Sequence, residues 1–320
     1  MDRPGALARL RATVAGFAAA RLADTQSWCV ALSGGPDSLA LTAVAAATMP
    51  TNALIVDHGL QYGSAAIAMT AYRQALDLGC VAAQVITVEV GNTGGPEAAA
   101  RAARYAALDT ARRGAPVLLA HTLDDQAETV LLGLGRGSGP RSIAGMRPCD
   151  PPWYRPLLDV RRSLTHAVCA ELDLPAWDDP HNHDRRFTRV RLRTEVLPLL
   201  EDVLGGGVAE ALARTAAALR EDTDALDGLA GAELTAASSG RALVVSAIGP
   251  LPAALRRRVI RGWLLTGGAT DLTDGQLRAV DALVTAWRGQ GGVAVGCDRP
   301  RTRLFAERCG DSLVLRFEPV

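Results

Sequence analysis

The sequence predicts an α/β protein with a Rossmann-like parallel sheet covered by helices on both faces, followed by a smaller, mainly helical C-terminal domain. Two observations support this prediction. Short apolar runs alternate with longer amphipathic segments up to about Gly135, which is typical of parallel strands joined by crossover helices. Beyond Gly135 the chain becomes rich in Gly, Arg and Pro, and the alternation stops.

The first half carries four predicted strands and four predicted helices. Buried strands are expected at the apolar runs Trp28–Leu32, Asn52–Val56, Ala83–Val90 and Pro116–Ala120. The amphipathic segments predict helices at Asp37–Thr48, Ser64–Leu78, Pro96–Arg113 and Asp124–Leu134. Because ligands of such sheets bind beyond the carboxyl ends of the strands, the loops that follow the strands are where a site is expected.

The second half predicts longer loops and a separate C-terminal domain. We expect an extended stretch at Arg155–Val160 and helices at Ser163–Leu172 and Arg189–Leu200. A polar loop rich in turn-forming residues lies between these helices, and long loops of this kind are often functional. Three glycines at 205–207 precede a leucine-striped helix over about 208–234. The predicted domains are 1–195 and 196–320, with mixed α/β structure from about 237 onward.

Composition limits the class of protein. The 320 residues carry a formal net charge of zero and no apolar run long enough to cross a bilayer, so we expect a cytoplasmic protein with no membrane partner. The Ala-rich start predicts an amphipathic helix, with an organellar presequence as the second interpretation. All 34 basic residues are arginine, which excludes a Walker A loop. The six cysteines form no CxxC pair, so a structural zinc or an iron–sulfur cluster is not expected.

The stretch LSGGPDSLAL (Leu32–Leu41) links the first predicted strand to the first predicted helix. Glycines there let the backbone turn tightly and approach a ligand. The free N–H groups at the start of a helix, together with its dipole, favour an anion. Asp37 is unusual at an anion site unless a metal ion lies between it and the anion. A plain helix cap and turn is the alternative interpretation.

The string SGGPDS resembles the SGGxDS signature of PP-loop ATP pyrophosphatases, which cleave ATP between the α- and β-phosphates. Further strings narrow the resemblance to the bacterial tRNA(Ile)-lysidine synthetases. They are VDHGLQ from Val56, with Gln61 where the family usually has Arg, EAAARAARYAAL from Glu97, HTLDDQAETVLLGLGRGSG from His121, and WDDPHNHDRRFTRVRLRTEVLPLL from Trp177. The matches are collinear from Ser33 to about Leu200.

The resemblance implies a two-step modification of an isoleucine tRNA that has a CAU anticodon. ATP adenylates the C2 oxygen of the wobble cytidine, and free L-lysine then attacks C2 and expels AMP. ATP and Mg²⁺ are therefore the expected small-molecule requirements. A homodimer is left open, since some members of the family pair. The rival interpretations are a PP-loop tRNA thiolase, which usually shows paired cysteines, and a non-catalytic nucleotide- or RNA-binding relative.

The resemblance also assigns residues to roles. The catalytic candidates are Asp37, which is also the Mg²⁺ ligand, and Asp124, Asp125 and Glu128, of which Asp124 and Glu128 are the lysine-binding candidates. The ATP and pyrophosphate candidates are Ser33, Gly34, Gly35, Pro36, Asp37, Ser38, His58 and Arg104. For the three acids that begin the helix at Asp124, favourable helix caps are the alternative interpretation.

A dense basic run follows the polar loop. An exposed charged surface is the usual interpretation of such a run, but arginines also suit the phosphates of a tRNA backbone. The residues predicted to bind tRNA are Arg101, Arg136, Arg185, Arg186, Arg189, Arg191 and Arg193.

Overall fold

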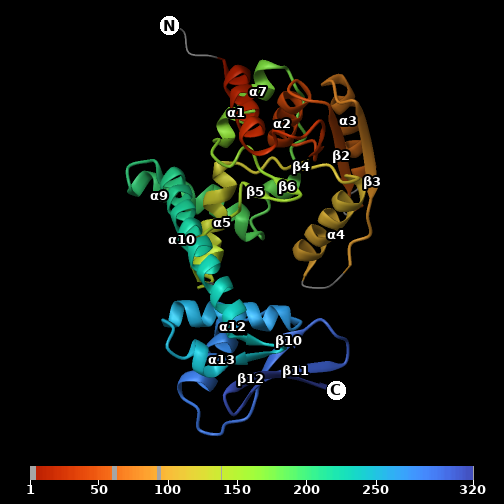
Figure 1. Ribbon diagram of the computed structural model, residues 1–320. Coiled ribbons are helices and arrows are strands. Elements are labelled where there is room, and N and C mark those ends of the chain that lie inside the picture. The colour runs from red at the N-terminus through yellow and green to blue at the C-terminus, as the bar shows by residue number, and fades with distance from the viewer. Residues whose placement is uncertain (1–4, 60–62, 92–94, 138, 320) are drawn as a thin grey trace. The chain divides into compact units, whose positions relative to one another are not determined.

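The computed structural model describes residues 5–59, 63–91, 95–137 and 139–319. The chain divides into two compact units (Figure 1). Unit 1 comprises Met1–Gly137 and Ser142–Ala216, and unit 2 comprises Ser138–Arg141 and Ala217–Val320. The predicted boundary between 195 and 196 falls earlier than this division. In the described residues, no helix is both long and apolar enough to span a membrane.

Unit 1 is built on a six-stranded sheet with the strand order β3-β2-β1-β4-β6-β5. All neighbouring strands are parallel except β5 and β6 at one edge. The strands are β1 (Trp28–Ala31), β2 (Thr51–Asp57), β3 (Ala82–Thr87), β4 (Val117–Leu118), β5 (Cys149–Asp150) and β6 (Trp153–Tyr154). The order reverses at β1, which places the crevice between the ends of β1 and β4 at the topological switch point where ligands of this architecture bind.

Both faces of the sheet are apolar and covered by helices. Val30 and its neighbours pack with α1, α2, α3 and α7 on one face, whereas Cys29 and Leu54 pack with α4 on the other. Figure 1 shows α1, α2 and α7 beside one another. The helices are α1 (Ala6–Arg21), α2 (Pro36–Ala46), α3 (Ser64–Asp77), α4 (Pro96–Ala111), α5 (Leu123–Gly135), α6 (Pro140–Ile143) and α7 (Arg162–Glu171). The predicted fold class is confirmed.

The predicted extended stretch at Arg155–Val160 is wrong. The structure folds it into consecutive turns, closed by hydrogen bonds from Leu158 N to Arg155 O and from Val160 N to Leu157 O. Leu157, Leu158 and Val160 are all buried. The apolar side chains of this stretch are therefore buried in a turn and not in a strand.

Four short helical segments, one of them a π turn, lie within and directly after the polar loop of unit 1. They are η1 (Pro180–His183), α8 (Thr188–Arg191), the π-helical η2 (Leu192–Val196) and α9 (Leu197–Val203). Pro198 has no N–H to donate to the carbonyl four residues back, and its ring crowds that carbonyl. A π turn directly before the proline accommodates both effects, and π turns are frequent at functional sites.

Unit 2 packs helices on an antiparallel sheet of order β7-β8-β12-β11-β10-β9. It therefore holds more sheet than a mainly helical domain would. The strands are β7 (Ser238–Ser239), β8 (Ala242–Val244), β9 (Ala269–Thr270), β10 (Val293–Cys297), β11 (Thr302–Cys309) and β12 (Ser312–Pro319). The helices are α11 (Val245–Ile248), α12 (Ala253–Thr266) and α13 (Asp274–Thr285), and α10 (Val208–Ala237) supplies residues to both units.

One glycine of α5 makes a close approach that is open to test. A Cβ on Gly133 would lie 2.7 Å from the carbonyl oxygen of Ser142, whereas a Cβ on Gly135 would meet nothing within 4 Å. Overpacking against backbone costs about 1–3 kcal/mol, so we expect Gly133→Ala to lower the free energy of unfolding by that amount. Gly135→Ala, the matched control, should cause no loss. Equal urea midpoints for the two variants would contradict the packing described for α5.

Candidate active site

The loop after β1 forms a backbone cradle at the start of α2. Gly34 adopts a φ of 85°, a left-handed conformation that favours glycine. The Ser38 hydroxyl donates to the Gly35 carbonyl at 2.9 Å and accepts from the Ser33 N–H at 3.2 Å. Its oxygen also lies 3.1 Å from that of Ser33. With Pro36 at the first helical position, these contacts hold the predicted phosphate loop in a turn whose amides begin a helix.

The start of α5 holds the predicted acidic residues through a capping box. Thr122 caps the helix, its hydroxyl accepts from the Asp125 N–H, and its own N–H donates to Asp125 Oδ2 at 2.8 Å. The other oxygen of Asp125 faces the guanidinium of Arg162 at 2.5 Å. Asp125 is thus both the helix cap of the alternative interpretation and a member of a charged cluster.

Arg162, at the start of α7, contacts all four predicted catalytic residues. Its backbone N–H donates to Asp124 Oδ2 at 2.7 Å. Its guanidinium lies 3.3 Å from Asp37, 2.5 Å from Asp125 and 3.5 Å from Glu128. Only 16% of the Arg162 side chain is exposed. The structure therefore brings the predicted acids of α2 and α5 together around an arginine that sequence reasoning did not identify.

Glu128 lies at the bottom of this cluster and is fully buried. Arg193, from the π turn η2, approaches its two oxygens with Nε at 2.7 Å and Nη2 at 3.2 Å. The same guanidinium lies 3.5 Å from Asp125. Arg189 reaches Glu128 at 4.0 Å and donates to the Thr129 hydroxyl at 3.3 Å. Two arginines of the run predicted to bind tRNA thus turn inward in this structure.

Arg161 forms ion pairs that hold the start of α5 in place. Its guanidinium lies 3.3 Å from Asp124, 3.0 Å from Glu210 and 3.7 Å from Glu201. The apolar side of the same helix packs on α9 and α10 through Leu123, Ala127, Leu197 and Ala209. These contacts fix α5, and with it the predicted catalytic acids, relative to α7.

Burial and charge act in opposite directions on two of the acids. Burial raises the pKa of Asp37, although a hydrogen bond from Thr165 and the charge of Arg162 oppose it. Burial alone would also raise the pKa of Asp125, but the Arg162 charge and the Thr122 hydrogen bonds outweigh it, so this pKa is lowered. The ionised form of Asp125 is therefore favoured, whereas burial favours the protonated form of Asp37.

His58 and His121 follow β2 and β4 at the same edge of the sheet. Burial, with help from Arg155 and Arg104 and opposed by Asp125, lowers the pKa of His121 to about 3. Burial and then Arg104 lower the pKa of His58. Both rings are neutral at neutral pH. Each has a buried Nδ1 with no hydrogen-bond partner within the described part of the chain. Such atoms suit a ligand that offers its own donor or acceptor.

The predicted residues on α4 lie near this edge. Arg101 donates to the Tyr105 hydroxyl at 3.2 Å, and its guanidinium carbon lies 4.8 Å from the centre of that ring. Burial lowers the pKa of Arg104, whose charge also acts on both histidines. Arg136 ends α5 as its C-cap and is exposed. Gln61, which departs from the family string, lies outside the described residues.

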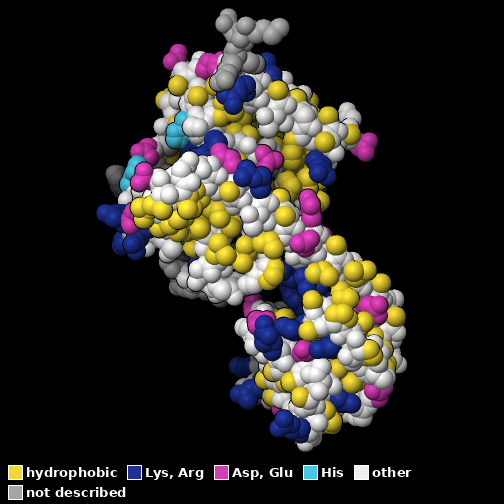
Figure 2. Space-filling view, turned by 90° about the vertical axis from the view of Figure 1, so that its left-hand side faces the viewer, with side chains coloured by type: hydrophobic (Ala, Val, Ile, Leu, Met, Phe, Trp, Pro, Cys, Tyr) yellow, Lys and Arg dark blue, Asp and Glu magenta, His cyan; other side chains and the backbone are white. Residues whose placement is uncertain are grey.

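The remaining arginines of the basic run stay on the surface, paired with acids. Arg185 and Arg191 both contact Glu195, at 2.8 and 3.3 Å. Arg186 contacts Asp184 at 2.6 Å and is 85% exposed. Figure 2 likewise shows positively and negatively charged side chains interspersed on the face drawn. Because these ion pairs are exposed, the arginines can readily exchange their acidic partners for other anions.

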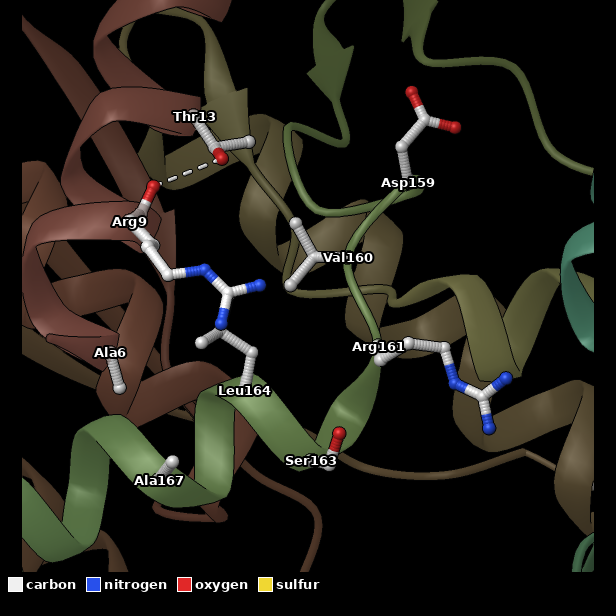
Figure 3. Close-up of a pocket in the computed structure, with 9 residues that line it drawn as sticks. All are labelled: Ala6, Arg9, Thr13, Asp159, Val160, Arg161, Ser163, Leu164 and Ala167. Atoms are coloured by element: carbon white, nitrogen blue, oxygen red, sulfur yellow. Dashed lines mark hydrogen bonds between the residues drawn. The ribbon is translucent and has the colours of Figure 1, made fainter. Parts of the chain in front are cut away.

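A pocket of about 430 Å³ opens beside the Arg161–Arg162 segment, between α1 and α7 (Figure 3). Its walls include Arg9, Thr13, Asp159 and Ser163. Figure 3 shows the Arg161 side chain extending away from Arg9, toward the acids it pairs with. None of the residues predicted from the sequence lines this pocket, so it is separate from the carboxylate cluster.

The fit of a magnesium ion depends on Asp37. No group of three or more His, Cys, Asp or Glu side chains among the described residues is arranged to hold a metal without a further ligand. Mg²⁺ is usually bound by one or two carboxylates together with substrate phosphates. Asp37, at the start of α2 and directly after the glycine turn, fits that pattern.

Comparisons with known proteins match both units. The PP-loop domain family model matches residues 8–200, and the TilS substrate binding domain model matches residues 243–309. A tRNA(Ile)-lysidine synthase of Mycolicibacterium paratuberculosis is 69% identical over 100% of both chains. The chain belongs to the tRNA(Ile)-lysidine synthase family. The enzymes of that name from Mycobacterium leprae and Nocardia farcinica are 65% and 61% identical, over 100% of both chains and over 96% and 97% of the two.

Membership in the lysidine synthase family confirms the predicted enzyme class, an ATP-dependent tRNA-modifying ligase, and ATP as its nucleotide. Among solved structures, the U34-tRNA thiolase NcsA from Methanococcus maripaludis has a TM-score of 0.55 at 16% identity. The match covers 68% of this chain and 80% of that chain. It supports the PP-loop fold alone.

The buried ion pairs of Glu128 generate a test of the cluster. Glu128→Gln removes one charge that faces Arg193 and Arg162, and losing a charged hydrogen-bond partner costs about 1–3 kcal/mol. We therefore expect the free energy of unfolding, measured with urea, to fall by that amount. Glu195→Gln is the control, since Glu195 also faces two arginines but on the surface, and it should cause no measurable loss. The same small change in both variants would argue against a buried charged cluster.

Proposed function

We propose that this protein converts the wobble cytidine of a CAU-anticodon isoleucine tRNA to lysidine, using ATP and free L-lysine. Family membership supports the overall reaction. The observation that carries the residue assignment is the meeting of Asp37, Asp125 and Glu128 around one guanidinium, next to the backbone cradle. The predicted phosphate loop and the acidic cluster are thus adjacent, and this supports a site for a nucleotide beside an amine substrate.

The reaction consists of two transfers. First, the C2 oxygen of cytidine attacks the α-phosphorus of ATP, and the bond to the bridging oxygen breaks to release pyrophosphate. Second, the lysine amine attacks C2, and the C2–oxygen bond breaks, so that AMP leaves with that oxygen. The amine must lose protons to attack and to form the product, and a nearby carboxylate is a suitable acceptor.

The first step depends mainly on positioning and charge neutralisation. We assign the leaving pyrophosphate to the cradle of Ser33, Gly34, Gly35 and Ser38, whose amides begin α2. Asp37 would hold Mg²⁺, which neutralises phosphate charge when bound. His58 and Arg104 border the nucleotide, and the unpartnered Nδ1 atoms at this edge supply further polar contacts.

The second step needs a site for a cationic amino acid. We assign the lysine ammonium to Asp124 and Glu128, with Asp125 held ionised beside them by Arg162. Glu128 is reached only by displacing or sharing Arg193 and Arg162. Arg162, Arg193 and Arg189 already pair with these acids, so a further cation binds only where its geometry fits.

The tRNA backbone would lie along the exposed arginines of the polar loop, Arg185, Arg186 and Arg191. Their present partners are surface acids, and phosphates compete well for such guanidinium groups. Arg189 and Arg193 remain predicted tRNA contacts, although their side chains now face Glu128. Arg101 and Arg136 also stay predictions, as do the homodimer and the cytoplasmic location.

Incorporation of radiolabelled lysine into tRNA tests the proposed reaction. With ATP and Mg²⁺, we expect labelled lysine in unmodified CAU-anticodon isoleucine tRNA and none in elongator methionine tRNA. Asp37→Ala should reduce the rate at least a hundredfold, because the charge beside the phosphates is lost. A folded wild-type protein that binds ATP but incorporates no lysine would refute the proposal. Full activity of Asp37→Ala would refute only the assignment of Asp37.

Salt dependence tests the assigned tRNA surface. Replacing Arg185 and Arg186 together with Gln should weaken tRNA binding and reduce the slope of log affinity against log salt by about 1–2, since each lost phosphate contact contributes about 0.9. Arg9→Gln combined with Arg11→Gln is the control, because both arginines are exposed on α1. An unchanged slope in the Arg185 and Arg186 variant would remove this loop from the tRNA-binding surface.

A further inference from the structure

Arg162 occupies the centre of the carboxylate cluster and belongs to none of the motifs that assign the reaction. It lies at the start of α7, whereas the acids lie on α2 and α5. Its guanidinium contacts Asp37 with Nε, Asp125 with Nη2 and Glu128 with Nη1. Each nitrogen therefore faces a different carboxylate. Arg193 reaches the same pair on α5, but in the part of the chain that the structure describes it forms no ion pair with Asp37.

We propose that Arg162 is a positioning residue that sets the spacing between the nucleotide-side carboxylate, Asp37, and the lysine-side carboxylates, Asp125 and Glu128. This inference rests on the proposed function. The two half-reactions use groups on different helices, and the amine must reach the carbon that ATP has activated. One rigid cation in contact with both sides fixes that distance.

The chemistry of the side chain suits this role. A guanidinium is planar and has five N–H donors in a fixed fork, so it can hold several carboxylates at defined angles. An ammonium is a compact charge on a flexible stem and cannot reproduce three directed contacts. The substitution Arg162→Lys should therefore keep the charge without the full geometry.

The charges of the cluster balance one another. When ionised, Asp37, Asp125 and Glu128 carry three negative charges, and Arg162, Arg193 and Arg189 supply three positive ones. Removing Arg162 would free the acids to move apart. Ligands that depend on the spacing of the acids should then bind less well even where the protein stays folded.

Steady-state kinetics of Arg162→Gln and Arg162→Lys separate positioning from stability. For Arg162→Gln we expect a lysine KM at least tenfold higher and a kcat at least tenfold lower, in line with the loss of charged hydrogen bonds. Arg162→Lys should fold and recover part of the kcat, with a lysine KM between those of the wild type and Arg162→Gln. If Arg162→Gln does not fold, the KM of Arg162→Lys alone decides.

Arg256→Gln is the matched control. Arg256 is also a largely buried arginine in an ion pair, with Nε 2.5 Å from Asp281, and it further donates to the Leu251 carbonyl at 2.6 Å. Its contacts lie within unit 2. We expect Arg256→Gln to lower the urea midpoint and to leave the lysine KM of the folded protein unchanged. Arg162 variants that behave in this way, with lower stability and an unchanged lysine KM, would overturn the proposal.

The absence of lysine from the chain provides a readout that does not depend on turnover. In Arg162→Lys made with ¹³Cε-lysine, the introduced side chain gives the only lysine signal of the protein. Adding Mg²⁺ with a non-hydrolysable ATP analogue, and separately adding unlabelled L-lysine, should each shift that signal. A signal that responds to neither would overturn the proposal. Wild-type protein without lysine incorporation would instead refute the proposed function, so the two failures are distinguishable.

Discussion

The contact of one buried guanidinium with carboxylates from two helices is the interaction on which the site of this protein depends. Arg162 joins Asp37 on α2 to Asp125 and Glu128 on α5. Four acids at one edge of a sheet would repel one another and draw apart without a cation among them. Arg161, Arg162, Arg189 and Arg193 hold them close, next to an amide-lined loop. This arrangement supports the proposal that a nucleotide and a cationic amino acid bind side by side.

The sheet explains why these helices meet. The strand order reverses at β1, so the loop after β1 and the start of α5 after β4 flank the same crevice. The buried turn after β6 then returns the chain to this crevice, where α7 begins with Arg162. The proposed site thus lies at the position where a doubly wound sheet opens, and Arg162 of α7 reaches it.

Sequence reasoning predicted four of the six strands of the first sheet, β1 to β4, the helices that follow them and the glycine turn, because local periodicity and turn chemistry decide those features. It missed the two-residue strands β5 and β6, which are too short to show a periodic pattern. It also selected the four acids that the structure brings together. It missed Arg162, since this residue lies between the predicted extended stretch at Arg155–Val160 and the predicted helix at Ser163–Leu172, whereas the observed helix begins at Arg162. It treated Arg189 and Arg193 as part of a surface run, whereas the structure turns both inward, Arg189 from α8 and Arg193 from the π turn η2. Long-range pairing of charges leaves no local pattern, so these contacts required the three-dimensional structure.

A double-mutant cycle between Arg162→Gln and Asp125→Asn, followed by urea unfolding, tests the central contact most directly. If the charged cluster organises the site, the two substitutions should be strongly non-additive, with a coupling free energy above about 1 kcal/mol, as found for residues within one ionic network. Free energies of unfolding that simply add would contradict the account, because Arg162 and Asp125 would then not act on each other in the folded protein.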